Sequence, residues 1–221
     1  MWLNLTPQLL AFIFSFFLAD VAKTHATTNV YAHLQEAVRE VKNNINLRYL
    51  SLSEVFGGAG LAAYEYQAAV FSAVWPTWAI GIARAIQEAG VVPSFYFAGK
   101  TIDILGIRKV IWVGMITASL GNIAAALARS IFSPIFIMIS LPLYGASDTA
   151  HQHVLQKEFT EHQRATIASL NSLGSSIYFS LVLYFCGLIA NNWGPFTALF
   201  ATQIFWLPSA YYQIKFLNKI K

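Results

Sequence analysis

Long apolar runs alternate with short polar stretches along most of the chain. Seven apolar segments stand out, at residues 2–19, 50–73, 78–98, 110–127, 131–150, 166–190 and 196–216. Crossing the hydrocarbon core of a bilayer takes about 20 apolar residues in an α-helix, and the last six segments are long enough. The pattern predicts an all-α, polytopic transmembrane helical bundle with six spans and a marginal seventh span at the N-terminus.

The first apolar segment fits two interpretations. Asn4, Thr6 and Gln8 interrupt its start, and the small residues around 22–26 resemble the cleavage site of a secretory signal peptide. However, residues 1–19 contain no Lys or Arg, whereas signal peptides begin with a positively charged region. We therefore favour a membrane span over a signal peptide.

Composition supports a membrane location. Hydrophobic residues make up 57% of the 221 residues and charged residues only 11%, whereas soluble domains carry roughly 25% charged residues. These proportions exclude a water-soluble globule, and the aromatic content of 15% excludes a disordered chain. The single cysteine, Cys186, excludes an internal disulfide framework.

Basic residues predict the orientation of the bundle. If the six spans alternate in direction, 12 of the 14 Lys and Arg residues share one side; Arg129 lies on the other and Arg84 within a segment. Because basic loops stay in the cytoplasm, we expect a cytoplasmic C-terminus. The net charge of +4 is thus a topology signal, and nucleic acid is not an expected partner.

The polar stretch 20–47 separates the first segment from the other six. Val30, Leu34, Val38 and Val41 recur at helical spacing within it, which fits either an amphipathic helix on the cytoplasmic membrane surface or a solvated linker. The expected organisation is an apolar segment at 1–19, a linker at 20–48, a transmembrane bundle at 49–216 and a cytoplasmic tail at 217–221.

Three charged residues inside the spans are candidates for a substrate or proton pathway. Glu65 lies well inside the second segment, where a carboxylate is costly unless it is neutralised, paired or facing water. We favour a cavity role over a structural hydrogen bond with Tyr64 or Tyr66. Arg84 and Glu88 are four residues apart and could pair on one helix face, either as structural support or as a gate.

Asp148 lies near the cytoplasmic end of the fifth segment. Ser147 and His151 beside it are four residues apart, but an intramembrane protease also needs oxyanion donors and a nucleophile loop. We therefore expect no enzyme. His151 and His153 alone are weak evidence for a metal, so no metal site is expected.

Residues that pack or break helices occur within the spans. Glycines permit close helix contact and prolines permit kinks. The residues concerned are Gly57, Gly58, Gly60, Pro93, Pro134 and Pro142.

The connection after the third segment carries a motif. Gly99, Asp103 and Gly106, followed by the basic residues Arg108 and Lys109, resemble the cytoplasmic signature of major facilitator superfamily transporters. In that resemblance the connection is a conformational latch. Ile104 and Ile107 stand where the family usually has basic residues.

A second connection, between the fifth and sixth segments, runs through Arg164 into a Ser-rich helix. It resembles the loop before helix eleven of bacterial efflux-type members of the same family. The segment order then makes the chain similar to the C-terminal half of such a transporter: helix six, the central loop and helices seven to twelve. The chain would be a fragment of a longer product, a shortened product or a half-size protein that assembles with a partner.

The resemblance implies a secondary active transporter in the bacterial inner membrane. It would move a small solute by alternating access and would need no cofactor. Drugs exported in exchange for protons are among the substrates that the resemblance implies. Expected partners are the lipid bilayer, the solute, and the missing N-terminal half or a second copy. The alternatives are a membrane assembly subunit that does not transport and, less favoured, an intramembrane enzyme.

Overall fold

A computed structural model of the chain describes residues 30–160 and 163–219. The first apolar segment and residues 20–29 of the linker lie outside the described residues, so the choice between span and signal peptide stays a prediction. The chain divides into two compact units, Met1–Ala32 and His33–Lys221. The helices and the site described below belong to the second unit, apart from the first residues of α2.

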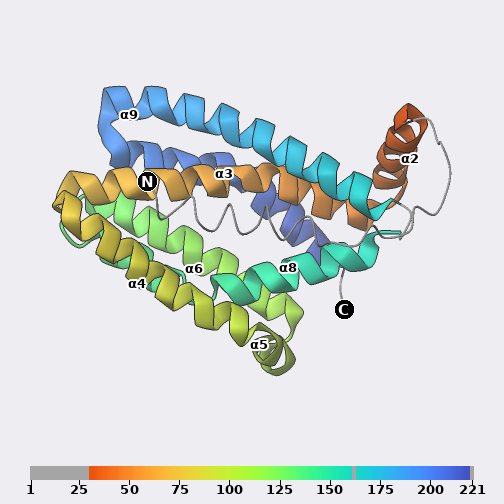
Figure 1. The fold of residues 1–221 in the computed structure, drawn as a ribbon, viewed down its shortest axis with the longest axis horizontal. Coiled ribbons are helices and arrows are strands. Elements are labelled where there is room, and N and C mark those ends of the chain that lie inside the picture. Colours follow the sequence, from red (N-terminus) through yellow and green to blue (C-terminus); the bar gives the residue numbers. More distant parts are fainter. Residues whose placement is uncertain (1–29, 161–162, 220–221) are drawn as a thin grey trace, which may run out of the picture. The chain divides into compact units, whose positions relative to one another are not determined.

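The described residues form helices joined by short connections, with no strand among them (Figure 1). This confirms the all-α class. The helices are α2 (Val30–Asn43), α3 (Ile45–Val74), α4 (Thr77–Tyr96), α5 (Ala98–Leu105), α6 (Ile107–Ala128), α7 (Ser133–Ser140), α8 (Tyr144–Glu158) and α9 (Arg164–Leu217).

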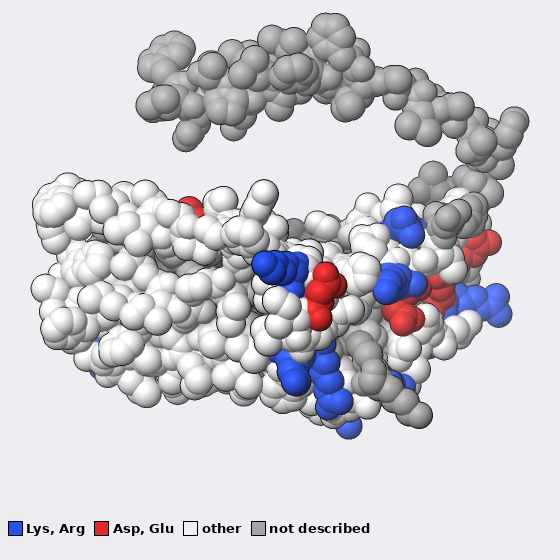
Figure 2. All heavy atoms as spheres, turned by 90° about the horizontal axis from the view of Figure 1, so that it is seen from below, with Lys and Arg blue, Asp and Glu red and all other residues white. Residues whose placement is uncertain are grey.

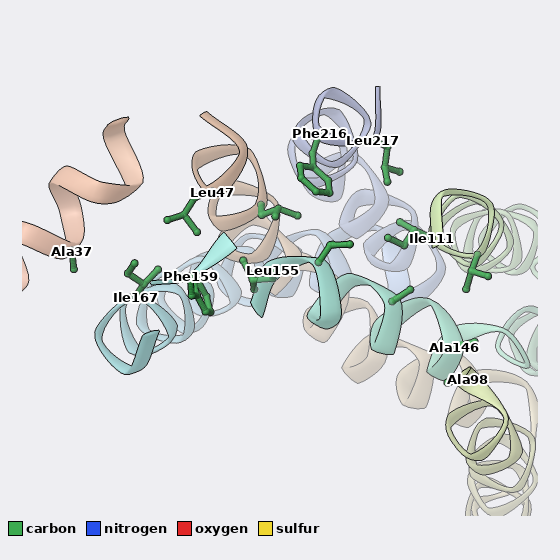
Figure 3. Packing of buried hydrophobic residues seen from close by; sticks show 14 residues of the cluster. Ala37, Leu47, Ala98, Ile111, Ala146, Leu155, Phe159, Ile167, Phe216 and Leu217 are labelled. Atoms are coloured by element: carbon green, nitrogen blue, oxygen red, sulfur yellow. The ribbon is translucent and has the colours of Figure 1, made fainter. Parts of the chain in front are cut away.

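Two hydrophobic clusters mark opposite ends of the bundle. One joins Leu47 at the start of α3, Ile111 near the start of α6 and Phe216 at the end of α9 (Figure 3). The other joins Phe71 near the end of α3 with Ala126 near the end of α6 and with residues of α4, α7 and α9. Successive long helices therefore run back and forth between the same two ends.

The fifth apolar segment is two helices instead of one. α7 ends at Ser140, and α8 begins at Tyr144 and continues to Glu158, well beyond the predicted end of the segment at residue 150. Pro142 lies in the break, and proline lacks the N–H that a continuous helix would need there. The break sets the direction in which α8 enters the bundle.

The sixth and seventh segments are joined within α9. Its 54 residues contain one non-helical residue, Gly194, with φ 82° and ψ 169°. Such a backbone conformation is almost restricted to glycine. Gly194 is therefore the corner at which α9 turns back along the bundle.

Small residues allow close packing between several helices. A Cβ atom added to Gly58 would collide with the backbone of Ser175 and Phe179 in α9, so this glycine fixes the contact between α3 and α9. Gly57 and Gly60, by contrast, have no atom closer than 3.9 Å to that position. Of the three neighbouring glycines, only Gly58 has the predicted packing role.

Two of the described helices are long and apolar enough to cross a membrane: α6 and α9, each with a mean hydropathy of 1.8. Large apolar side chains also lie on the surface of other helices, including Ile139, which is 71% exposed, and Val92, which is 64% exposed. Figure 2 shows the charged side chains gathered toward the end where α3 begins and α8 ends, while most of the remaining face is uncharged. These features fit a membrane protein.

Candidate functional site

A partly open cavity of about 550 Å³ lies between the helices of the bundle. Residues of α3, α4, α6, α8 and α9 line it, because each helix presents one face with positions three or four residues apart. The polar side chains of its lining include Glu54, Gln67, Gln87, Glu88, Asn122, Asp148, His151, Gln203 and Gln213. A cavity of this size holds a small molecule.

Glu54, His151 and Gln213 form a hydrogen-bonded chain across three helices. Gln213 Nε2 lies 3.0 Å from His151 Nδ1, and an amide nitrogen only donates, so Nδ1 accepts. The proton of the neutral imidazole is then on Nε2, which donates to Glu54 Oε2 at 3.0 Å. The contact between His151 and Glu54 becomes an ion pair when the imidazole ring is protonated. This hydrogen-bonded series of side chains therefore holds an ionisable carboxylate and an ionisable imidazole in direct contact.

A second polar group in the lining is a cluster of amides. Gln67 Nε2 donates to Asn122 Oδ1 at 3.0 Å, and Gln87 Nε2 donates to Gln67 Oε1 at 3.0 Å. Arg84 lies against this cluster and donates to Gln87 Oε1 at 3.1 Å. α3, α4 and α6 are thus joined by polar contacts in the interior of the bundle.

Arg84 and Glu88 do not form the predicted pair. Arg84 donates to the backbone oxygen of Tyr64 at 2.7 Å, and its guanidinium carbon lies 3.9 Å from the centre of the Tyr64 ring. Glu88 instead accepts a hydrogen bond from the Tyr64 hydroxyl at 3.1 Å. The prediction was wrong because a residue of the neighbouring helix competes with the partner four residues away. Only Glu88 of the two lines the cavity.

Glu65 lies outside the cavity lining and its side chain is exposed. Glu65 thus does not contribute to this cavity, and its role in a substrate or proton pathway stays a prediction. The carboxylate of α3 that does line the cavity is Glu54.

Asp148 lines the cavity from α8, one turn from His151. No hydrogen bond or ion pair joins it to another described residue. Ser147 donates to the backbone oxygen of Ile111 at 3.5 Å, and both ring nitrogens of His151 already have other partners. Ser147 and His151 thus do not form the contact between nucleophile and base that an enzyme would need.

The predicted loop motif after the third segment is mostly helical. Gly99 and Asp103 lie in α5, exposed, and an added Cβ at Gly99 would meet open space. The role of this connection as a conformational latch stays a prediction. Gly106 separates α5 from α6 with φ 81° and ψ 147°, and Arg108 Nη2 donates to Asn218 Oδ1 at 3.2 Å, which links α6 to the end of α9. Lys109 is exposed.

The connection between α8 and α9, which resembles the loop before helix eleven of the efflux-type transporters, packs against α2. Glu40 of α2 accepts from Thr160 Oγ1 at 3.0 Å, and Glu36 accepts from Gln163 Nε2 at 3.0 Å. Arg164 begins α9 and is exposed. α2 is therefore held to the connection between α8 and α9 by its acidic side chains, whereas Leu34 and Val38 of its apolar face remain partly exposed, at 40% each.

No cluster of three or more His, Cys, Asp or Glu side chains that could hold a metal is present in the described part of the chain. His153 is exposed. The polar cavity residues that the sequence analysis missed are Glu54, Gln67, Gln87, Asn122, Gln203 and Gln213. Glu54 lies inside an apolar segment just as Glu65 does, so its position in the sequence carried the same signal.

Comparison with known proteins gives one informative similarity. The chain is 31% identical over 126 residues to a protein of Bacillus subtilis (strain 168) described as the uncharacterized MFS-type transporter YdeG. The aligned part covers 55% of this chain and 29% of that relative. No protein-family model matches the chain, and no solved structure matches it. The similarity supports membership of the major facilitator superfamily and a transporter function in general, in preference to an enzyme.

Proposed function

We propose that this chain is the C-terminal half of a secondary active transporter that moves a small solute by alternating access. In this proposal Glu54 and His151 together bind the proton that is exchanged for the solute, and the 550 Å³ cavity holds the solute. The single observation that carries the proposal is the direct contact between these two ionisable groups in the lining of a cavity inside an apolar bundle.

Six membrane passes follow from the fold if each traverse of the bundle is a span. α9 contains 54 residues, or about 80 Å at 1.5 Å per residue, enough for two passes of a bilayer about 30 Å thick. α3, α4 with α5, α6, and α7 with α8 supply the other four. The gathering of basic residues at one end supports a cytoplasmic C-terminus in the bacterial inner membrane.

A partner is part of the proposal. The related transporter is longer than this chain, because the 126 aligned residues are only 29% of its length. Alternating access in this family needs two six-helix halves that rock against each other. We therefore assign the facing half to another part of the same gene product or to a second subunit.

Proton coupling is tested in inside-out membrane vesicles that contain the full gene product. Respiration acidifies the vesicle lumen, and a pH-sensitive acridine dye reports whether an added solute releases protons. A panel of sugars, amino acids, carboxylates and organic cations is screened. The proposal expects at least one solute to release protons in the wild type and none to do so in Glu54→Gln.

Glu65→Gln is the matched control, because Glu65 is a carboxylate of the same helix outside the cavity. It should retain proton release. If Glu65→Gln abolished proton release and Glu54→Gln retained it, the proton-carrying role would belong to Glu65, as the sequence suggested. No proton release by any solute would reject proton coupling.

A further inference from the structure

A second hollow, here called the α8–α9 groove, lies beside the cavity. It is partly open and has a volume of about 240 Å³. This volume has room for several water molecules, because each occupies about 30 Å³ in the liquid. Side chains of α3, α8 and α9 line the groove, and the polar ones include Glu54, Gln152, Gln156, Asn171, Ser172 and Ser176.

Glu54 lines both the groove and the cavity. Its carboxylate oxygen Oε2 lies 3.0 Å from Nε2 of His151, which lines the cavity but not the groove. The other oxygen, Oε1, lies 3.5 Å from Nε2 of Gln152, which lines the groove but not the cavity. Consecutive residues of a helix point about 100° apart, so α8 presents one of these partners to each hollow. The carboxylate therefore stands at the boundary between the two.

Asn171 gives independent evidence that the groove holds a polar ligand. It is only 6% exposed, and its Nδ2 has no hydrogen-bond partner among the described residues. A buried amide N–H without an acceptor is unfavourable, and water or a ligand usually satisfies such a group. Asn171 lines the groove and not the cavity. Water is an acceptor that fits a hollow of this size lined by amides and hydroxyls.

The groove extends toward the end of the bundle at which the charged side chains gather. Ala168 and Ser176 of α9 both line it, and they are eight residues apart, which is about 12 Å along a helix. Phe159 at the end of α8 also lines it and belongs, with Leu155, to the hydrophobic cluster at that end (Figure 3). In the proposed orientation this end faces the cytoplasm.

We propose that the α8–α9 groove is a water-filled proton route between Glu54 and the cytoplasm, separate from the cavity that holds the solute. The inference rests on the proposed function, in which Glu54 binds the exchanged proton. A proton that leaves Glu54 passes to water in the groove, and the carboxylate that remains keeps its hydrogen bond from His151. Gln152 is a positioning residue, because its amide lies against the oxygen on the groove side.

The first test needs no solute. Inside-out vesicles turn the proposed cytoplasmic end outward, and the full gene product carries one introduced cysteine with its other cysteines replaced. Asn171→Cys should react with an added, positively charged methanethiosulfonate reagent although the native residue is buried. Ile167→Cys should not react, because Ile167 is equally buried one turn earlier in α9 and lines neither hollow. No reaction at position 171, or equal rates at both positions, would overturn the inference.

The second test fills the groove. The same reagent is attached to Ser172→Cys, and proton release is measured with the acridine dye and the panel of solutes named above. Modification should slow proton release at least about tenfold, because proton transfer needs groups within hydrogen-bond reach, directly or through water. Equilibrium binding of the same radiolabelled solute should be unchanged. Ser169→Cys is the matched control: Ser169 is exposed on the same helix and lines neither hollow, so its modification should change neither quantity.

Gln152→Leu reaches the same comparison without a reagent. It should slow proton release and spare solute binding, whereas a general loss of structure would lower both. Unchanged proton release after complete modification at position 172 would overturn the inference and keep the proposed function. Loss of solute binding together with proton release would also overturn it, since groove and cavity would then be one path. If no solute releases protons from the wild type, the proposed function fails, and the route fails with it.

Discussion

His151 Nε2 of α8 lies 3.0 Å from Glu54 Oε2 of α3, although 97 residues separate the two in the chain. The other ring nitrogen, Nδ1, accepts from Gln213 of α9. One imidazole thus joins three helices that line the cavity. Its substitution should affect both the stability of the bundle and the chemistry of the site.

Replacing His151 should destabilise the bundle. His151→Phe keeps a ring in the same place but leaves the Glu54 carboxylate and the Gln213 amide without their partner, which costs about 1–3 kcal/mol for each buried polar group so left. Thermal unfolding followed by size-exclusion chromatography should show a lower midpoint. His153→Phe is the control, because His153 is exposed on the same helix and its replacement should leave the midpoint unchanged. Equal midpoints for both variants and wild type would contradict the network.

Gly58→Ala should weaken the packing of α3 against α9. The added methyl group would collide with the backbone of Ser175 and Phe179, and overpacking typically costs about 1–3 kcal/mol. The same unfolding measurement should show a clear loss of stability. Gly60→Ala, where the nearest atom is 4.0 Å from the added carbon, should be at least as stable as wild type. A stable Gly58→Ala would mean that the two helices are farther apart.

Gly99→Ala and Gly106→Ala should change stability in opposite directions. Gly106 has φ 81°, a conformation that costs other residues on the order of 1–3 kcal/mol. Gly99 is helical with open space around it, so alanine should stabilise α5 by up to about 1 kcal/mol. Unfolding midpoints of the two variants check the prediction. A rise in the unfolding midpoint of both variants would argue against the turn at Gly106.

Cysteine labelling should place the two ends of the bundle on opposite sides of the membrane. In a Cys186→Ser background, Asn192→Cys introduces a thiol near the corner at Gly194, and Lys219→Cys introduces one at the end of the described chain; both native side chains are exposed. A membrane-impermeant maleimide added to intact cells should label only the cysteine at 192. The cysteine at 219 should react after permeabilisation. Labelling of both from outside would reject the proposed orientation.

The length of the apolar runs was enough to predict a bundle of helices, but local backbone chemistry changed the ends of those helices. Pro142 divides the fifth segment, and Gly194 turns the sixth into the seventh without a loop. From the sequence, residues 98–105 were interpreted only as a connection, because Gly99 and Gly106 form a loop motif. In the structure these eight residues form the helix α5, which ends before Gly106.

The candidate site was only partly predictable for a geometric reason. Glu54 and Glu65 are 11 residues apart, which is about three helical turns at 3.6 residues per turn, so helical periodicity places them on nearly the same side of α3. What distinguishes them is the element opposite: α8 brings His151 to Glu54, while Glu65 remains exposed. Asp148 was singled out near the end of the fifth segment and Glu88 within the third, and both line the cavity, but contacts from other helices could not be foreseen from either position.

The Gln213 amide has a consequence for how protonation could be transmitted through the bundle. If a proton were added to His151 Nδ1, two donors would face each other across a contact of 3.0 Å. A half-turn of the Gln213 amide group would remove the conflict, because its oxygen would then accept from Nδ1–H. The present hydrogen bond from Gln213 Nε2 would be lost. The last helix also donates from Ser209 to the backbone of Ser53, at 2.7 Å, beside Glu54. A rotation of one uncharged side chain would thus convert the arrival of a proton on α8 into a changed contact between α8 and α9.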